Sequence, residues 1–389
     1  MPLAALILID SVIESNAAEQ SIKDSCEETH PLYPLPILRV GKKVIFRLLT
    51  IVAGLVISVG LVEVGLRIVG WPAPGLYQNG NGPIALRAPG HNGGAYPPNV
   101  SGHLKHYDYD VEWVVNSYGF RDRSLEPKAP SEWRVGIVGD SFSAGVGVEN
   151  SDRFSDVWYS RIRQQYANVT LWNLSSPACG TACEAEILDG VGRQYDLDEI
   201  LLAFYSGNDA QDNYEWSQEP SPQIPQESLS SCAKDWLRLH SRFATFLWVY
   251  GIRAFANFDP PGIYSEAELR RYWPYTEKAL ARFQSITHSR PLTILYIPNV
   301  AEWDDNSWQK IRERFQLSDD ARFLLKQSVA AWAQRNSVRF IDSTPWLRQC
   351  QPANECVFPV DGHWTAHAHA RVGSRLAEFW QPERNSHGK

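Results

Sequence analysis

The sequence predicts an α/β fold in which a mainly parallel sheet lies between two layers of helices, preceded by one N-terminal transmembrane helix. From residue 134 onward, short apolar segments typical of buried strands alternate with longer segments typical of helices. Upstream of them lies one long segment without charge. With 389 residues, 44% of them hydrophobic and 21% charged, the chain has an ordinary globular composition. Its net charge of −7 disfavours a nucleic-acid-binding protein, which needs a basic face.

The apolar segment 44–69 predicts a helix that crosses a membrane. Its centre, Leu48–Val62, has no charged residue, and about 20 helical residues cross the hydrocarbon core. Basic residues precede it, at Arg39, Lys42, Lys43 and Arg47. The positive-inside rule therefore keeps the N-terminal side in the cytoplasm. No small-residue cleavage site follows, which favours an uncleaved anchor over residues 41–70 rather than a signal peptide, and the lack of a polar face disfavours a core helix.

The segments beside the anchor predict little regular structure. Residues 1–40 include a polar, acidic stretch and are predicted to form a poorly ordered cytoplasmic tail. Residues 71–131 are interpreted as a linker and N-terminal extension, because 72–99 is rich in Gly, Pro and Asn. Within the extension, 107–115 alternates like a strand, and the turn Asn116–Arg121 follows.

The main domain is predicted over residues 132–381 as alternating strands and helices. The predicted strands are 135–138, 169–174, 200–205, 292–297 and 338–341. The predicted helices are 154–166, 183–192, 266–287, 319–334 and 366–379. Residues 210–264 break the alternation with Pro, Ser and Gln and with an apolar helix near 243–255, which we interpret as an insertion over the site. Such alternation predicts a parallel sheet covered on both faces.

The first strand of this domain ends at Gly139-Asp140-Ser141, followed by a small-residue turn. A serine at the carboxyl end of a strand lies where ligands bind in open α/β sheets, and the backbone N–H groups of the next turn favour negative charge there. This placement suits a nucleophile. The alternative is a turn in which Asp140 or Ser141 bonds only to the local backbone.

Three more polar segments follow strands or precede the last helix: 173–180, Gly207-Asn208-Asp209 and 361–365. Acyl transfer through a serine needs a nucleophile, an imidazole base, a carboxylate that orients it, and donors to the oxyanion. Ser141, His363, Asp361 and Asn208 could supply one of each. Asp140 and Asp209 are expected to be structural.

In these motifs the chain resembles the SGNH (GDSL-type) hydrolase superfamily, over about residues 134–379. Gly139-Asp140-Ser141 is similar to its first block, with the nucleophile. Gly180 resembles the oxyanion glycine of the second block, and Asn208 the oxyanion asparagine of the third. Asp361 and His363 resemble the last block. The anchor followed by Asn116–Arg121 is similar to membrane-anchored bacterial members. The resemblance implies a flavodoxin-like three-layer α/β/α sandwich, a Ser141-His363-Asp361 triad, and an oxyanion hole from Ser141, Gly180 and Asn208.

The chain departs from the family pattern at two places. Ala178 and Cys179 precede Gly180 where the second block often has more glycine. The usual D-x-x-H would place the acid at Val360, whereas Asp361 stands two residues before His363. That spacing resembles the D-x-H-W form of alginate O-acetylation proteins, and it leaves transfer to a sugar hydroxyl open beside hydrolysis.

We therefore expect a serine esterase of the bacterial inner membrane whose catalytic domain faces the periplasm. Its partners are an ester substrate, such as the O-acetyl groups of a cell-envelope glycan, and the membrane through residues 44–69, with no nucleic acid. One alternative is an O-acyltransferase that modifies a periplasmic polysaccharide. The other is an inactive, membrane-tethered glycan-binding protein.

No metal and no cofactor are expected. His363, His367 and His369 form an H-x-x-x-H-x-H pattern, but a helix would not place all three on one face. Cys26 precedes the anchor and should stay reduced, while five cysteines follow it, so at least one of those is unpaired within the chain. Cys350–Cys356 is the favoured disulfide, and Cys179–Cys183 is an alternative in a turn.

Overall fold

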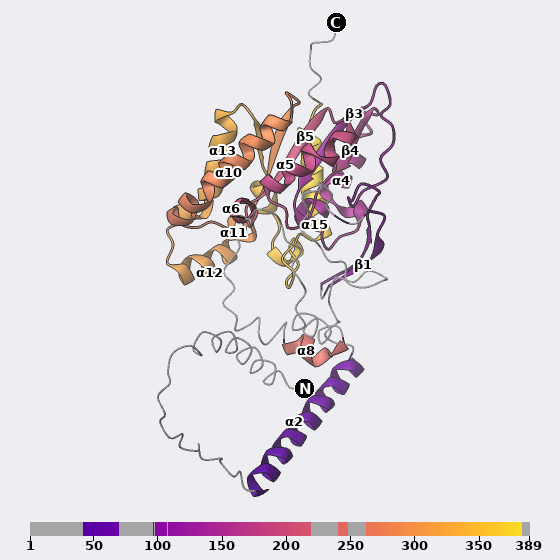
Figure 1. The fold of residues 1–389 in the computed structure, drawn as a ribbon. Helices are drawn as coiled ribbons and strands as arrows, with labels where there is room; N and C mark the ends of the chain where they lie inside the picture. Colours follow the sequence, from indigo (N-terminus) through magenta and orange to yellow (C-terminus); the bar gives the residue numbers. More distant parts are fainter. Residues whose placement is uncertain are drawn as a thin grey trace, which may run out of the picture. The chain divides into compact units, whose positions relative to one another are not determined.

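The computed structural model covers the chain in two compact units, residues 1–72 with 226–246 and residues 73–225 with 247–389. Figure 1 shows the chain as a ribbon coloured from indigo at its N-terminus to yellow at its C-terminus. The residues that the structure describes are 42–69, 96, 98–106, 108–218, 240–247 and 262–382. The predicted tail 1–40 and most of the predicted linker lie outside these residues.

The first unit contains one long apolar helix, α2, from Lys42 to Val69. Its segment Leu49–Val69 has a mean hydropathy of 2.3 and is long and apolar enough to cross a membrane, in agreement with the predicted span. Near its C-terminal end, the Glu63 carboxylate accepts hydrogen bonds from the Ser241 hydroxyl at 2.9 Å and the Phe243 N–H at 2.8 Å. These bonds hold the short helix α8, Arg242–Phe246, against α2.

The second unit is built on a parallel sheet of the described strands β3 to β7. Their bounds are Trp133–Gly139, Val169–Asn173, Glu199–Tyr205, Leu292–Ile297 and Arg339–Asp342. They lie in the order β4-β3-β5-β6-β7, and every neighbouring pair is parallel. Numbered along the chain this is 2-1-3-4-5, the flavodoxin-like order, in which the switch point lies beside the first strand. The predicted fold class is confirmed.

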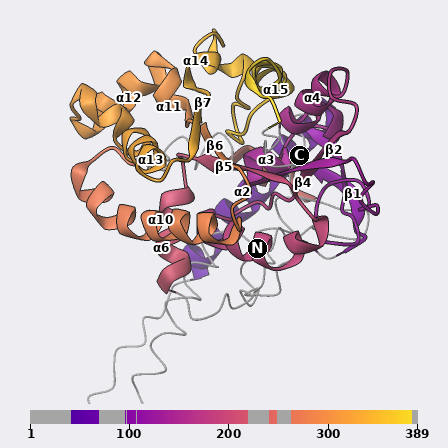
Figure 2. The same ribbon diagram turned by 90° about the horizontal axis from the view of Figure 1, so that it is seen from above.

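Helices cover both faces of this sheet (Figure 2). One layer contains α5 Thr181–Asp189, α10 Glu266–Ile286 and α13 Leu324–Arg335. The other contains α4 Phe154–Ile162, α11 Val300–Trp303, α14 Thr344–Leu347 and α15 Ala366–Phe379. Successive residues of β5 alternate between the two cores: Leu202 and Phe204 face one, Leu201 and Ala203 the other. This double burial explains why β5 is a continuous apolar run.

The N-terminal extension forms a β-hairpin where the sequence predicts a single strand. Strand β1, Ser101–Lys105, pairs antiparallel with β2, Asp110–Val114. In β2, Val111 and Trp113 point inward and their neighbours outward, which is the alternation that predicts a strand. In β1 only Leu104 is a buried apolar residue, so no pattern signals it.

The predicted insertion 210–264 begins with a helix of the domain itself. Helix α6 runs from Asp209 to Gln218, and Ala210 and Asn213 are buried in it. The interruption therefore starts after Gln218. Most of the predicted helix 243–255 lies outside the described residues. Helix α12, Asp305–Phe315, was not predicted, because Trp308 is its one buried residue and the rest of the helix is polar.

Candidate active site

Ser141 follows β3 after one residue, Asp140, and begins the four-residue helix α3, Ser141–Ala144. Asp140 caps this helix by accepting a hydrogen bond from the Phe142 N–H at 2.9 Å. A Cβ on Gly139 would lie 2.5 Å from the Ser143 hydroxyl oxygen, so only glycine fits at this turn. This turn places Ser141 at the carboxyl edge of the sheet.

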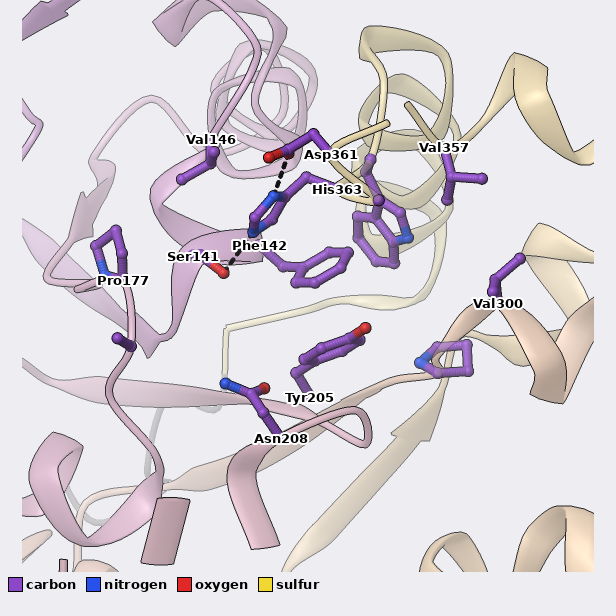
Figure 3. Close-up of a pocket in the computed structure, with 14 residues that line it drawn as sticks. Ser141, Phe142, Val146, Pro177, Tyr205, Asn208, Val300, Val357, Asp361 and His363 are labelled. Atoms are coloured by element: carbon purple, nitrogen blue, oxygen red, sulfur yellow. Dashed lines mark hydrogen bonds and ion pairs between the residues drawn. The ribbon is translucent and has the colours of Figure 1, made fainter. Parts of the chain in front are cut away.

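Ser141, His363 and Asp361 form a hydrogen-bonded series (Figure 3). The Nε2 atom of His363 lies 2.7 Å from the Ser141 hydroxyl oxygen. The Nδ1 atom of His363 is hydrogen-bonded to the Asp361 carboxylate. Gly362, between the two, has φ +90°, which lets the chain turn so that Asp361 reaches the ring two residues on. The two-residue spacing thus still brings the Asp361 carboxylate to the His363 ring.

The two ionisable groups of this series shift each other's pKa in opposite directions. Burial alone would raise the pKa of Asp361, but the charge and hydrogen bond of His363 lower it below its ordinary value. Burial alone would lower the pKa of His363, but Asp361 raises it above its ordinary value. An ionised Asp361 keeps the proton of the neutral imidazole on Nδ1, so that Nε2 can accept the Ser141 proton.

Asn208 reaches the same pocket from the turn between β5 and α6 (Figure 3). Its Nδ2 atom donates one hydrogen bond to the Asp212 carboxylate at 2.7 Å. An amide nitrogen has two N–H groups, so the second can donate elsewhere. Burial raises the pKa of Asp212 to about 7. No motif in the sequence singles out Asp212, although it stands one helical turn after Asn208.

Gly180 lies at the N-terminus of α5, and the pocket wall nearest to it is formed by Pro177 and Ala178. Ala178 has φ +57°, a backbone conformation that favours glycine. A disulfide joins Cys179 to Cys183 in this turn. The structure therefore brings Ser141, His363, Asp361 and Asn208 to one pocket, whereas Gly180 is not among the residues that line it.

The pocket is a cavity of about 540 Å³ with mainly apolar walls. Its apolar lining consists of Phe142, Val146, Pro177, Ala178, Tyr205, Pro298, Val300, Val357 and Trp364. The rings of Phe142 and Tyr205 lie 4.0 Å apart, centroid to centroid. Pro177, Ala178 and Trp364 belong to the segments 173–180 and 361–365, which the sequence places at this edge of the sheet. Pro298, Val300 and Val357 come from segments that no motif marks.

The upstream motif 116–121 folds onto the turn that contains Ser141. The Asn116 side-chain oxygen accepts hydrogen bonds from the N–H groups of Tyr118, at 2.9 Å, and Phe120, at 3.1 Å, and so closes the turn. The buried Arg121 guanidinium donates to the carbonyl oxygens of Glu112, Ala144, Gly145 and Val148, at 2.7, 3.3, 2.7 and 2.8 Å. One side chain thereby holds the loop that follows Ser141.

The other two histidines of the pattern lie apart from this site. His369 is fully buried, and its Nδ1 atom accepts a hydrogen bond from the Phe154 N–H at 3.2 Å. Burial lowers the pKa of His369 to about 3. His367 lies 3.2 Å from Arg371 on the exposed side of α15. Among the residues that the structure describes, no three His, Cys, Asp or Glu side chains are grouped as metal ligands.

Two disulfides lie near the site. Cys350–Cys356, the pair that the sequence favours, is bonded and precedes the loop of Asp361 and His363. Cys179–Cys183 is bonded as well. Cys26 and Cys232 lie outside the described residues.

No protein-family model and no curated protein matches this sequence. Several solved structures are similar to it. One similar structure is the lipase/acylhydrolase from Enterococcus faecalis, with 13% identity over 65% of this chain and 99% of its own, at a TM-score of 0.37. A second is a member of the lipolytic protein G-D-S-L family from Veillonella parvula DSM 2008, which has 12% sequence identity and a TM-score of 0.36. The match covers 64% of this chain and 98% of that protein. A third is the acetyl xylan esterase AlAXEase, which has 10% sequence identity and a TM-score of 0.39. The match covers 63% of this chain and 98% of that protein.

Proposed function

We propose that this chain is a serine ester hydrolase of the SGNH type that works through an acyl-enzyme on Ser141. The observation that carries the proposal is the 2.7 Å contact between the Ser141 hydroxyl and Nε2 of His363, with Asp361 bonded to the other ring nitrogen. A nucleophile, a base and a group that orients the base are the parts that acyl transfer requires.

In the proposed reaction, His363 takes the proton of Ser141 while the serine oxygen attacks the ester carbonyl. The tetrahedral intermediate collapses, its C–O bond to the alcohol breaks, and His363 returns the proton to the leaving alkoxide. Water then attacks the acyl-enzyme, His363 removes its proton, and the carboxylic acid leaves as Ser141 regains its hydrogen. Asp361 stays ionised throughout and stabilises the imidazolium.

The negative charge on the tetrahedral oxygen needs donors preorganised around it. We assign the free N–H of the Asn208 amide to this role, because Asp212 holds the other N–H and so fixes the orientation of the group. The backbone N–H of Ser141 is a second donor in this proposal. The third comes from the turn 178–180, where the predicted donor is Gly180 and the residue at the pocket wall is Ala178.

The substrate proposed for the first tests is an O-acetylated cell-envelope glycan, and transfer of the acyl group to a glycan hydroxyl is the competing outcome. We further propose that α2 anchors the chain in the inner membrane with the catalytic domain in the periplasm. The basic residues before the span support this orientation. So do the two disulfides of the domain, which persist in an oxidising compartment.

The test is turnover of p-nitrophenyl acetate by the full chain in detergent, with and without acetylated or unacetylated glycan. We expect Ser141→Ala and His363→Ala each to lose at least about 10³-fold in kcat. His367→Ala, on the exposed side of the neighbouring helix, is the matched control and should keep wild-type turnover. A fluorophosphonate should label Ser141, as identified by peptide mass. Turnover that survives in Ser141→Ala contradicts the proposal, and acyl transfer to glycan faster than to water selects the transferase.

A further inference from the structure

We propose that the β1–β2 hairpin of the N-terminal extension is part of the active site, because Asp108 and His106 in its turn hold Asp361 in place. Both are positioning residues, which act on the substrate only through Asp361. The inference rests on the proposed function, and it assigns a catalytic contribution to a segment that lies outside the residues resembling the SGNH motifs.

The first contact joins Asp108 to the backbone of the acid loop. One oxygen of Asp108, Oδ2, accepts hydrogen bonds from the N–H groups of Val360, at 3.0 Å, and Asp361, at 2.7 Å. The Asp108 side chain is only 7% exposed. Two hydrogen bonds from adjacent N–H groups to one buried carboxylate fix both the position and the orientation of that peptide segment.

The second contact joins His106 to the Asp361 carboxylate itself. Nε2 of His106 lies 3.8 Å from Oδ1 of Asp361, while Oδ2 of Asp361 is bonded to His363. The catalytic acid thus lies between two imidazoles, one on each oxygen. His106 is also 3.8 Å from Asp108, so the three side chains form one compact group.

Aromatic packing brings the hairpin turn and the acid loop together independently of these polar contacts. The His106 ring stacks on Tyr109, with centroids 5.1 Å apart, and Tyr109 packs on Phe358 at 5.1 Å. Phe358 belongs to the acid loop, since its N–H donates to the His363 carbonyl at 2.9 Å. The hairpin is tied to the nucleophile loop as well, because the Glu112 N–H donates to Glu149 at 3.0 Å.

The short spacing of the acid and base explains why such support matters. Gly362 has φ +90°, and a Cβ placed on it would meet no atom within 4 Å, so its outer side is open. Backbone hydrogen bonds from the Phe358 N–H to the His363 carbonyl and from the Gly362 N–H to the Phe358 carbonyl, both at 2.9 Å, close this turn. The N–H groups of Val360 and Asp361 bond instead to Asp108. Asp108 fixes the direction of these two N–H groups from a segment that lies 252 and 253 positions earlier in the chain than Val360 and Asp361.

The experiment measures kcat and KM for p-nitrophenyl acetate with the full chain in detergent. We expect Asp108→Ala to lower kcat by about 10- to 100-fold with KM within about twofold, because small misplacements of a catalytic group are this costly. Asp108→Asn keeps a side-chain oxygen that can accept hydrogen bonds from both N–H groups, so this variant should retain most of the wild-type kcat. It also serves if Asp108→Ala does not fold. His106→Ala should show the same pattern with a smaller loss.

The same hairpin offers a matched control pair. His103 and Asp110 are the exposed counterparts of His106 and Asp108, with a 2.9 Å contact to each other. His103→Ala and Asp110→Ala should leave kcat at the wild-type value. In the background of Asp361→Ala, the further change Asp108→Ala should have no effect on the residual kcat, because Asp108 acts only through Asp361.

Two results would overturn the inference. One is a kcat for Asp108→Ala equal to that of Asp110→Ala. The other is that Asp108→Ala lowers kcat by the same factor in the wild-type chain and in the Asp361→Ala background. Failure of the proposed function is a different result, in which Ser141→Ala and Asp361→Ala themselves leave turnover intact.

Discussion

Nε2 of His363 lies 2.7 Å from the hydroxyl oxygen of Ser141, although 222 positions separate the two residues along the chain. The contact joins the turn after β3 to the loop before α15. In the proposed mechanism, proton transfer across this contact depends on the protonation state of His363, whose pKa Asp361 raises from the other side of the ring. The pH dependence of ester hydrolysis is therefore the first property to examine.

We expect kcat/KM to rise with pH and to level off once His363 is neutral, because only the neutral imidazole accepts the serine proton. The inflection should lie above about 6.5, the ordinary histidine pKa, since Asp361 raises the pKa of His363. Asp361→Asn removes that charge, so the inflection should move to lower pH while kcat falls by about 10⁴-fold. A pH profile in which Asp361→Asn leaves the inflection unmoved would contradict this coupling.

The second prediction concerns Asn208 and the carboxylate that orients it. Asn208→Ala should lower kcat by about 10²- to 10³-fold, the usual effect of losing one oxyanion donor. Asp212→Ala frees the Asn208 amide and should lower kcat by about tenfold with KM unchanged, whereas Asp212→Asn keeps an acceptor and should lose less. Steady-state kinetics of the three variants decide the matter. A larger loss for Asp212→Asn than for Asp212→Ala would refute the positioning role.

The third prediction concerns Glu184, a fully buried carboxyl on α5. Burial raises its pKa, and the nearby carboxyls of Asp140 and Asp212 raise it further. A folded-state pKa above the unfolded value means that the folded protein binds the extra proton, so stability falls as pH rises above the ordinary value of about 4.3. Glu184→Gln removes the titrating carboxyl, so this variant should gain more stability relative to the wild type at pH 8 than at pH 5.

Thermal melting at the two pH values measures this effect. Glu186→Gln is the control, because Glu186 lies on the same helix with its side chain 51% exposed. Equal melting shifts at pH 5 and pH 8 for Glu184→Gln would show that the carboxyl does not titrate differently in the folded protein.

The fourth prediction concerns Arg121, whose guanidinium donates to four backbone carbonyls around the nucleophile loop. Arg121→Lys keeps the charge but has no planar fork, so buried carbonyls lose their donors. We expect a loss of about 2–4 kcal/mol in stability. Chemical denaturation measures it, with the exposed Arg161→Lys on α4 as control. A variant as stable as the control would show that the loop does not depend on the fork.

The strands and helices around the sheet could be predicted from the sequence to within a few residues. The predicted strand 292–297 and helix 366–379 have the observed bounds, Leu292–Ile297 and Ala366–Phe379. Elements with a weak apolar pattern were missed, as in β1, where a single inward leucine gives no alternation. The two disulfides agree with the pairs considered from spacing, although spacing alone did not decide whether Cys179–Cys183 forms.

By itself the sequence determined which residues carry reactive groups and at which strand ends they stand, since apolar periodicity and turn residues are local properties of the chain. Only the tertiary structure decided what holds those groups. Asp108 bonds the acid loop, Asp212 bonds Asn208, and Pro177 and Ala178 line the pocket wall ahead of Gly180. Such contacts join segments far apart in the chain, and they exist only once the sheet and its helices have packed.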